Sequence, residues 1–297
     1  MDLLGAVETG GTLVRCARGT GPHDVHEAVA IPTTDDPVAV VTAVLAFFAA
    51  GPPVARVGVA AFGPIEVDPD ALGWGRLLRT PKPGWSGFAL GPALREGLGV
   101  PVVLDSDVNA AALAEGSEGG AAPGVRPLAY LTVGTGIGLG VLVGEAPLRG
   151  LLHPEGGHLR VPRAPGDEGF AGTCPYHGDC WEGLASGPAI AARWGVDPVR
   201  LPLGHPAWAL EAGYVAAGLA AVALVLSPRR IVLGGGVGGR PDVLAGVRER
   251  LPALLAGGFD RPADVAAASA LVVPPAHADA GLAGALGLAA SGAMAVD

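Results

Sequence analysis

Two segments far apart in the sequence share one pattern: an apolar run, a short turn of Gly and Thr, and a second apolar run. The first joins residues 3–7 to residues 13–17 through ETGGT, and the second joins residues 128–133 to residues 137–143 through GTG. Apolar runs on either side of a Gly-rich turn are typical of β-hairpins. The pattern therefore predicts a chain of two halves, each of which begins with a hairpin.

Strand and helix signals alternate along the rest of the chain. An acidic pair before Pro37 and an apolar repeat behind it predict an N-capped helix that ends near Gly51. Further apolar runs predict strands at residues 56–62, 100–104 and 231–233 and helices at residues 208–226, 242–255 and 279–290. Residues 66–87 lack a clear period and are expected to form a long loop. This alternation favours an α/β architecture, with a domain boundary near residues 116–127.

Composition and charge narrow the class of protein. Hydrophobic residues make up 50% of the chain, which excludes a disordered protein, and the formal net charge is -9. Because nucleic-acid binding depends on clustered Lys and Arg, the acidic balance argues against that partner. Neither an uninterrupted apolar stretch of roughly 20 residues nor a signal-peptide pattern is present. We therefore expect a cytoplasmic protein with no membrane or nucleic-acid partner.

Three Gly-rich turns are candidates for binding phosphate. They follow predicted strands at residues 9–12, 134–138 and 234–238, where backbone N–H groups can reach anionic oxygens. A Walker A loop is excluded because Lys82, the only lysine of the chain, lies outside such a motif. The last turn matches GxGxxG, but the acidic residue after a following strand is missing, so a nicotinamide enzyme is a weaker alternative. Together the turns indicate a nucleotide held between two lobes.

Asp107 is the candidate general base. It follows a buried strand at the end where α/β sheets place their ligands, and Asp105 lies two positions before it. A carboxylate in this place can take a proton from a substrate hydroxyl. The alternative interpretation of Asp107 is the N-cap of the helix that follows.

A group of Cys and His residues indicates a metal site. Cys174, His177 and Cys180 occur at three-residue spacing, and His158 supplies a fourth ligand for a closed, structural Zn²⁺ site. His153 competes with His158 for the fourth place, because both belong to HPEGGH. Two free thiols or a small disulfide loop are the alternatives.

Four segments carry a resemblance to a known family: LTVGTGIGLG, HPEGGH, CPYHGDCWEGLASGPAI and IVLGGGV. On these segments the chain resembles the ROK family of sugar kinases, most closely its bacterial fructokinase branch. The resemblance implies a two-lobed, actin-like ATPase (ribonuclease H-like) fold with a cleft between the lobes. It also implies ATP with Mg²⁺ and transfer of the γ-phosphoryl group to a hexose hydroxyl. Homodimers are common in the family.

The resemblance extends to single residues. Asp107 matches the catalytic base. Matches to the sugar site are Gly63, Pro64, Ser106, Glu155, His158 and Glu182. Matches to the ATP side are Gly10, Gly11, Thr12, Gly134, Thr135, Gly136, Pro188, Gly235 and Gly236. The zinc ligands match His158, Cys174, His177 and Cys180, so that His158 would face both zinc and sugar.

The implied domains are an N-terminal lobe of residues 1–118 and a C-terminal lobe of residues 119–278. The first carries the sugar and phosphate side and is joined by the helix at residues 279–297. The second carries the zinc loop, the nucleotide side and the dimer surface.

Three departures bear on the function. Family members usually begin DxGGTK, whereas this chain has Glu8 and Leu13, so the acidic group is longer and the lysine is missing. Ser106 replaces an Asn that is frequent in glucose-specific members, which favours D-fructose, with mannose as a further substrate. The alternatives are a glucokinase, an N-acetylhexosamine kinase and a sugar-binding regulator without catalysis. A DNA-binding repressor is disfavoured, because the phosphate hairpin starts within ten residues of the N-terminus.

Overall fold

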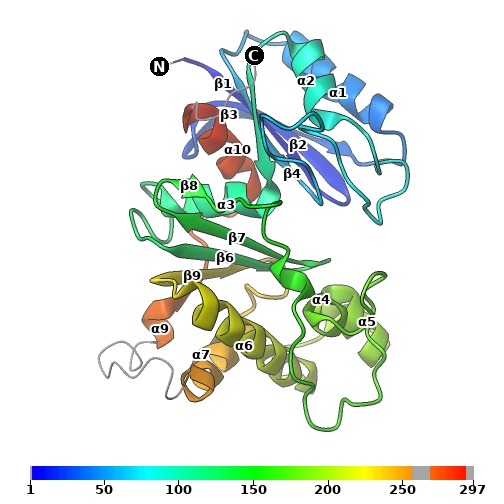
Figure 1. Ribbon diagram of the computed structural model, residues 1–297, viewed down its shortest axis with the longest axis vertical. Coiled ribbons are helices and arrows are strands. Elements are labelled where there is room, and N and C mark those ends of the chain that lie inside the picture. The colour runs from blue at the N-terminus through cyan, green and yellow to red at the C-terminus, as the bar shows by residue number, and fades with distance from the viewer. Residues whose placement is uncertain (1, 256–267, 292–297) are drawn as a thin grey trace. The chain divides into compact units, whose positions relative to one another are not determined.

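The computed structural model describes residues 2–255 and 268–291 and divides the chain into two compact units (Figure 1). The first unit comprises residues 1–123, 145–154 and 276–297, and the second comprises residues 124–144 and 155–275. The first unit is therefore built from three separate segments of the sequence.

The first unit contains one mixed β-sheet. Its elements are β1 (Leu4–Thr9), β2 (Leu13–Gly21), β3 (Asp24–Pro32), α1 (Pro37–Ala49), β4 (Val57–Ala61), α2 (Leu90–Leu98), β5 (Val102–Ser106), α3 (Asp107–Gly116), the short β8 (Ala146–Pro147) and α10 (Ala280–Ser291). The strand order is β3-β2-β1-β4-β5, with β1 antiparallel to β2, and β1, β4 and β5 mutually parallel. Because parallel strands end at the same edge, the first Gly turn, Gly63 and Asp107 follow neighbouring strand ends.

Helices cover both faces of this sheet. Val7 and Val59 belong to a core cluster with α1 and α2, whereas their neighbours Ala6 and Ala60 pack with α3 and α10. Figure 1 shows α10 lying along the strands of this sheet. The close approach depends on Gly58 of β4, since a Cβ there would lie 1.9 Å from the carbonyl oxygen of Ala285. The alternation of side chains along each strand thus builds two apolar layers.

The second unit repeats the same strand pattern. Its strands are β6 (Leu128–Val133), β7 (Ile137–Val143), β9 (Arg230–Gly234) and β10 (Val272–Val273). Within this unit they lie in the order β10-β9-β6-β7. β6 is antiparallel to β7 and parallel to β9, as β1 is to β2 and β4. The helical elements are η1 (Gly156–His158), α4 (Trp181–Ala185), α5 (Gly187–Trp194), η2 (Pro198–Arg200), α6 (Pro206–Leu226), α7 (Pro241–Leu255) and α9 (Ala268–Leu271).

The sequence predictions agree with most of these elements. Both hairpins are confirmed, and α1 begins at Pro37 with Asp36 as its N-cap, whose carboxylate accepts the N–H groups of Val38 and Ala39. The sequence analysis missed β3, an edge strand whose residues are almost all exposed, and the short helix α2. Residues 66–87 contain no helix and only isolated bridges to other segments, as the missing period predicts.

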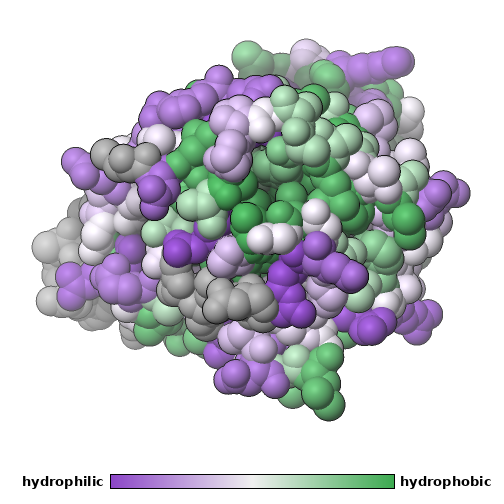
Figure 2. Space-filling model, turned by 90° about the horizontal axis from the view of Figure 1, so that it is seen from above, coloured by the Kyte–Doolittle hydropathy of each residue, from purple (hydrophilic) through white to green (hydrophobic). Residues whose placement is uncertain are grey.

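One described helix, α6, has the length and apolar composition to cross a bilayer. More than half of its apolar window is buried, and it packs against α4 and α7 within the second unit. This is the environment of a core helix. The face in Figure 2 mixes hydrophobic groups near its centre with hydrophilic groups along much of its margin. In the first unit, exposed apolar side chains include Val25 and Val29 on β3 and Val38 on α1.

Candidate active site and candidate metal centre

Asp107 is the first residue of α3, directly after the buried strand β5. Ser106 is the N-cap of this helix, and its Oγ accepts the N–H of Asn109 at 3.3 Å. The interpretation of Asp107 itself as the N-cap is therefore wrong, because the cap lies one residue earlier. The Oδ1 of Asp107 accepts the N–H of Val108 at 2.9 Å, and the residue is only partly exposed.

The surroundings of Asp107 disfavour its charged form. Burial raises the pKa of its carboxyl group to about 7, and the negative charges of Glu8 and Asp105 add to the effect. The hydrogen bond from Val108 acts in the opposite direction. A carboxyl group with a pKa of about 7 is suited to accept a proton near neutral pH.

Asp105 does not serve as the base but holds the segment that carries Asp107. Its side chain is buried, and its Oδ2 accepts two hydrogen bonds from Arg149, at 2.6 and 3.1 Å. Its Oδ1 accepts the side-chain amide of Asn109 at 2.9 Å and the N–H of Ser106 at 2.7 Å. Asp105 thus fixes the start of α3, where Asp107 lies. The sequence analysis missed Arg149, which lies 44 positions away from its partner.

His153 lies in the first unit beside the predicted sugar-binding backbone. Its Nε2 accepts the N–H of Ile65 at 3.3 Å, and a Cβ on Gly63 would lie 3.0 Å from its ring. Burial lowers the pKa of His153, so its neutral form, with an unprotonated Nε2, is favoured. These contacts place His153 outside the Cys/His group, which decides between the two candidates for the fourth ligand.

The first Gly turn is held from one side. The N–H of Thr33 donates to the carbonyl of Thr12, and its Oγ1 donates to the carbonyl of Gly10, both at 2.9 Å. A Cβ on Gly11 would meet nothing within 4 Å, so the other side of the turn is open. Glu8 lies just before the turn and forms an ion pair with Arg15 at 2.9 Å. Burial, followed by the charge of Asp279, raises the pKa of Glu8.

The two Gly turns of the second unit are joined through β6. Val133, the last residue of β6, accepts the N–H groups of Val237 and Gly238 at 2.9 and 3.1 Å. Gly235 has a φ of +85°, and a Cβ there would lie 2.3 Å from the carbonyl oxygen of Val133. Glycine is needed here for both conformation and space.

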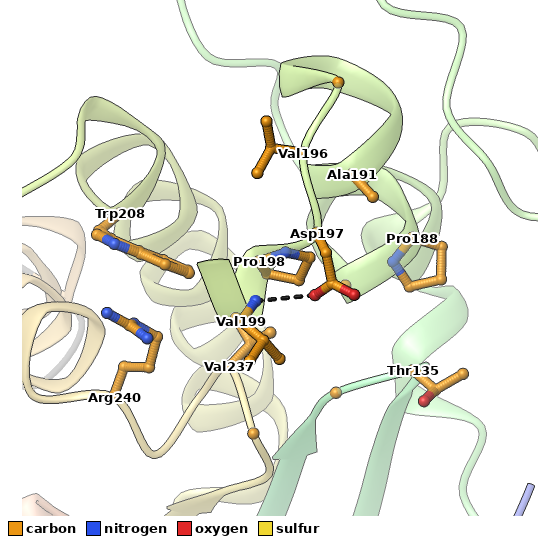
Figure 3. Close-up of a pocket in the computed structure, with 14 residues that line it drawn as sticks. Thr135, Pro188, Ala191, Val196, Asp197, Pro198, Val199, Trp208, Val237 and Arg240 are labelled. Atoms are coloured by element: carbon orange, nitrogen blue, oxygen red, sulfur yellow. Dashed lines mark hydrogen bonds between the residues drawn. The ribbon is translucent and has the colours of Figure 1, made fainter. Parts of the chain in front are cut away.

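These turns line a cavity of about 900 Å³. Four residues predicted for the ATP side are among its lining: Gly134, Thr135, Pro188 and Gly236. Figure 3 shows Thr135 and Pro188 on one side and Trp208 and Arg240 on the other. The guanidinium carbon of Arg240 lies 3.9 Å from the centroid of the Trp208 ring. The sequence analysis missed both of these residues, since neither belongs to a Gly-rich turn.

The Cys/His group comes together as the spacing predicts. Single ligand atoms of His158, Cys174, His177 and Cys180 all lie within 4.8 Å of one another. His158 Nδ1 is 3.5 Å from Cys180 Sγ and 3.7 Å from Cys174 Sγ, and His177 Nδ1 is 3.8 Å from Cys174 Sγ. Tetrahedral zinc bonds of about 2.0–2.3 Å give ligand-to-ligand distances of roughly 3.3–3.8 Å. Both the donor set and the spacing therefore fit zinc.

The backbone around this group is closely packed. Cys174 and Gly178 exchange two backbone hydrogen bonds, at 3.1 and 2.9 Å, which close a tight turn. The carboxylate of Asp179 forms ion pairs with Arg160 and Arg163. The turn therefore has support of its own, independent of a bound ion.

Glu155 and Glu182 lie beside His158 in different ways. Glu155 Oε2 is 3.8 Å from Nε2 of His158, on the ring nitrogen opposite the Cys/His group. Glu182 Oε2 accepts the N–H of Ile137 at 3.0 Å, at the start of β7. The negative charge of Glu182 raises the pKa of His158, although burial lowers it more. The structure thus brings the metal group, the second hairpin and these two carboxylates together within one unit.

Known sugar kinases match this chain both in sequence and in structure. The ROK family profile matches residues 4–291. A fructokinase of Pediococcus pentosaceus is 39% identical over 86% of this chain and 87% of its own, and a fructokinase of Zymomonas mobilis is 38% identical over 97% and 96%. A ROK glucokinase of Streptomyces griseus, solved with glucose and AMPPNP, is 28% identical with a TM-score of 0.77 over 97% of this chain and 99% of its own.

Proposed function

The chain belongs to the ROK family and has the actin-like ATPase fold of its sugar kinases, and from that membership we propose that it is an ATP-dependent fructokinase. The observation that carries the proposal is the identity of 38–39% to two fructokinases over at least 86% of the chain, together with the carboxyl group of Asp107 at the end of β5. The identity to glucokinases is lower, 28% for the Streptomyces griseus enzyme and 30% for the one from Streptomyces coelicolor. We therefore place D-fructose first, with mannose as a second substrate.

Asp107 is the proposed general base. It takes the proton of the attacking hexose hydroxyl while that oxygen bonds to the γ-phosphorus of ATP and the bond to the ADP oxygen breaks. Asp105, held by Arg149, keeps the start of α3 in place. The predicted sugar residues Gly63, Pro64, Ser106, Glu155, His158 and Glu182 remain proposals for binding the hexose.

The cavity of the second unit is the proposed nucleotide site. Gly134, Thr135 and Gly236 line it with the backbone groups and the hydroxyl that phosphate oxygens require. Trp208 and Arg240 offer an aromatic and cationic surface at the opposite side (Figure 3). A volume of about 900 Å³ is sufficient for a nucleotide, since ligand pockets usually measure roughly 300–1,000 Å³. The predicted phosphate residues Gly10, Gly11, Thr12, Gly136 and Gly235 remain proposals.

Mg²⁺ and zinc would have different places. Mg²⁺ prefers carboxylates together with phosphate oxygens, and Glu8 lies near enough to Asp107 for its charge to raise the pKa of that group. Glu8 would therefore hold Mg²⁺, which would neutralise phosphate charge during transfer, and Asp107 would stay free to act as the base. His158, Cys174, His177 and Cys180 would hold a structural Zn²⁺. With Nδ1 on the metal, Nε2 of His158 carries the proton and can donate it in a hydrogen bond.

The experiment is a comparison of kcat/KM for ADP release with Mg²⁺, ATP and each of four sugars: fructose, mannose, glucose and N-acetylglucosamine. Preference for fructose or mannose by at least about tenfold, about 1.4 kcal/mol of transition-state discrimination, supports the fructokinase proposal. Preference for glucose or N-acetylglucosamine would replace it with one of the related kinases. Turnover with none of them, from folded protein with its metal, would leave a sugar-binding regulator.

The cellular location and the oligomeric state are proposed from the same family membership. We propose a cytoplasmic homodimer, on the resemblance to the family. Sedimentation equilibrium of the purified chain tests the assembly, and a mass of one chain, 29.3 kDa, at micromolar concentration would contradict it.

A further inference from the structure

Lys82 lies at the first Gly turn. Its Nζ donates a hydrogen bond to the carbonyl oxygen of Gly11, although the two residues are 71 positions apart. The family pattern DxGGTK has a lysine at the position where this chain has the exposed Leu13. The only lysine of the chain thus reaches the turn from which the usual lysine is missing.

The loop that carries Lys82 is anchored on both sides of it. Trp85 is fully buried and donates its Nε1–H to the carbonyl of Thr34 at 2.7 Å. Gly84 packs so tightly that a Cβ would lie 1.8 Å from the carbonyl oxygen of Asp35. On the other side, the N–H of Thr80 donates to Ser86 Oγ, and that hydroxyl donates back to the carbonyl of Thr80, both at 3.1 Å. The backbone position of Lys82 is therefore fixed by the packing of the segment 80–86.

The charge of Lys82 remains available for an anion. Within residues 2–255 and 268–291, Lys82 forms no ion pair, and its partner Gly11 is an uncharged carbonyl. The neighbouring cation Arg15 is already paired with Glu8 and lies 3.4 Å from Asp279. Lys82 is thus a cation at this turn whose only recorded partner is neutral.

We propose that Lys82 binds the terminal phosphoryl group of the phosphoryl donor at the first Gly turn, within the first unit, and supplies there the positive charge that Leu13 does not. This inference rests on the proposed function. The Nζ exchanges the carbonyl of Gly11 for a phosphoryl oxygen, and the open side of Gly11 leaves room for that group. A cation at this position stabilises the charge on the transferred phosphoryl group, so its effect is greatest on transfer and on nucleotides that carry the γ-phosphate.

The test compares Lys82→Met, Lys82→Arg and the double variant Lys82→Met/Leu13→Lys. Lys82→Met should lower kcat/KM for ATP by about 10²–10³, as removal of one charge-stabilising donor does elsewhere. Lys82→Arg should retain more of the activity than Lys82→Met, because it keeps the charge. The double variant should recover at least about tenfold, since position 13 is the alternative origin of the same charge. Arg95→Met, which removes a cation from α2 of the same unit, is the control and should behave as the parent.

A second measurement does not depend on turnover. Calorimetry with AMPPNP and with ADP should show that Lys82→Met weakens AMPPNP binding at least about tenfold and leaves ADP binding within about twofold. Equal effects on both nucleotides, or kcat/KM within threefold of the parent, would overturn the assignment. If the parent protein turns over no sugar, the proposed function fails, and the AMPPNP-to-ADP ratio alone decides the role of Lys82.

Discussion

The rate of phosphoryl transfer should fall about tenfold between pH 8 and pH 6, because Asp107 must be ionised to accept the proton. With a pKa of about 7, about nine-tenths of this group is ionised at pH 8 and about one-tenth at pH 6. An Asp at its ordinary value of 3.8 would be ionised throughout this range, and the rate would not change. The assay is kcat/KM for fructose at saturating Mg-ATP across pH 5.5–8.5, with coupling enzymes in excess.

Glu8→Gln separates this explanation from other titrating groups. The charge of Glu8 raises the pKa of Asp107, so its removal should shift the acid limb to lower pH even where the plateau rate falls. An acid limb that stays in place in Glu8→Gln, or a parent profile that is flat down to pH 5.5, would refute the reasoning.

The same pKa has a consequence for stability. Between about pH 4 and pH 7 the unfolded chain ionises Asp107 while the folded chain keeps it protonated, so the folded state binds more protons and stability falls as pH rises. Asp107→Asn removes this loss. Its melting temperature should equal that of the parent near pH 4 and exceed it near pH 8. The opposite order at pH 8 would show that ionised Asp107 stabilises the fold.

Three further changes have defined outcomes. Arg149→Met leaves the buried carboxylate of Asp105 without a cation and should lower the free energy of unfolding in urea by about 3–5 kcal/mol. Arg149→Met/Asp105→Asn should recover part of this loss, and a loss below about 1 kcal/mol in Arg149→Met would contradict the pairing. Cys174→Ser should reduce bound zinc, measured by plasma emission spectrometry, from about one equivalent to a small fraction, and it should lower the melting temperature. A parent protein that is fully stable without metal would contradict the zinc site. Arg240→Met should raise KM for ATP severalfold and leave KM for fructose unchanged. The reverse pattern would contradict the assignment of this cavity to the nucleotide.

The sequence predicted those helices and strands whose signals lie within a few neighbouring residues. The two hairpins and α1 follow from alternating apolar runs, Gly turns and the Asp36 cap, and each of these signals acts within a few residues. β3 escaped prediction because its apolar residues do not alternate with polar ones, which is the pattern that reveals a strand with one buried face.

The site was predictable where its members are close in sequence. The spacing of Cys174, His177 and Cys180 gave the metal group, and the choice of His158 over His153 needed the contact between His153 and Ile65. Arg149 and Lys82 act on partners 44 and 71 positions away, and no periodicity encodes such pairs. Their roles depend on packing, which a single sequence does not display.

The central claim is that Asp107 is the base of a fructose kinase, and one measurement tests it most directly. Initial rates of ADP release at saturating fructose and Mg-ATP are compared for the parent and Asp107→Asn, with fructose binding of both followed by calorimetry. The account predicts a fall of at least about 10²-fold in rate, with fructose affinity within a few-fold of the parent. A rate near that of the parent, from a variant that binds fructose normally, would contradict it.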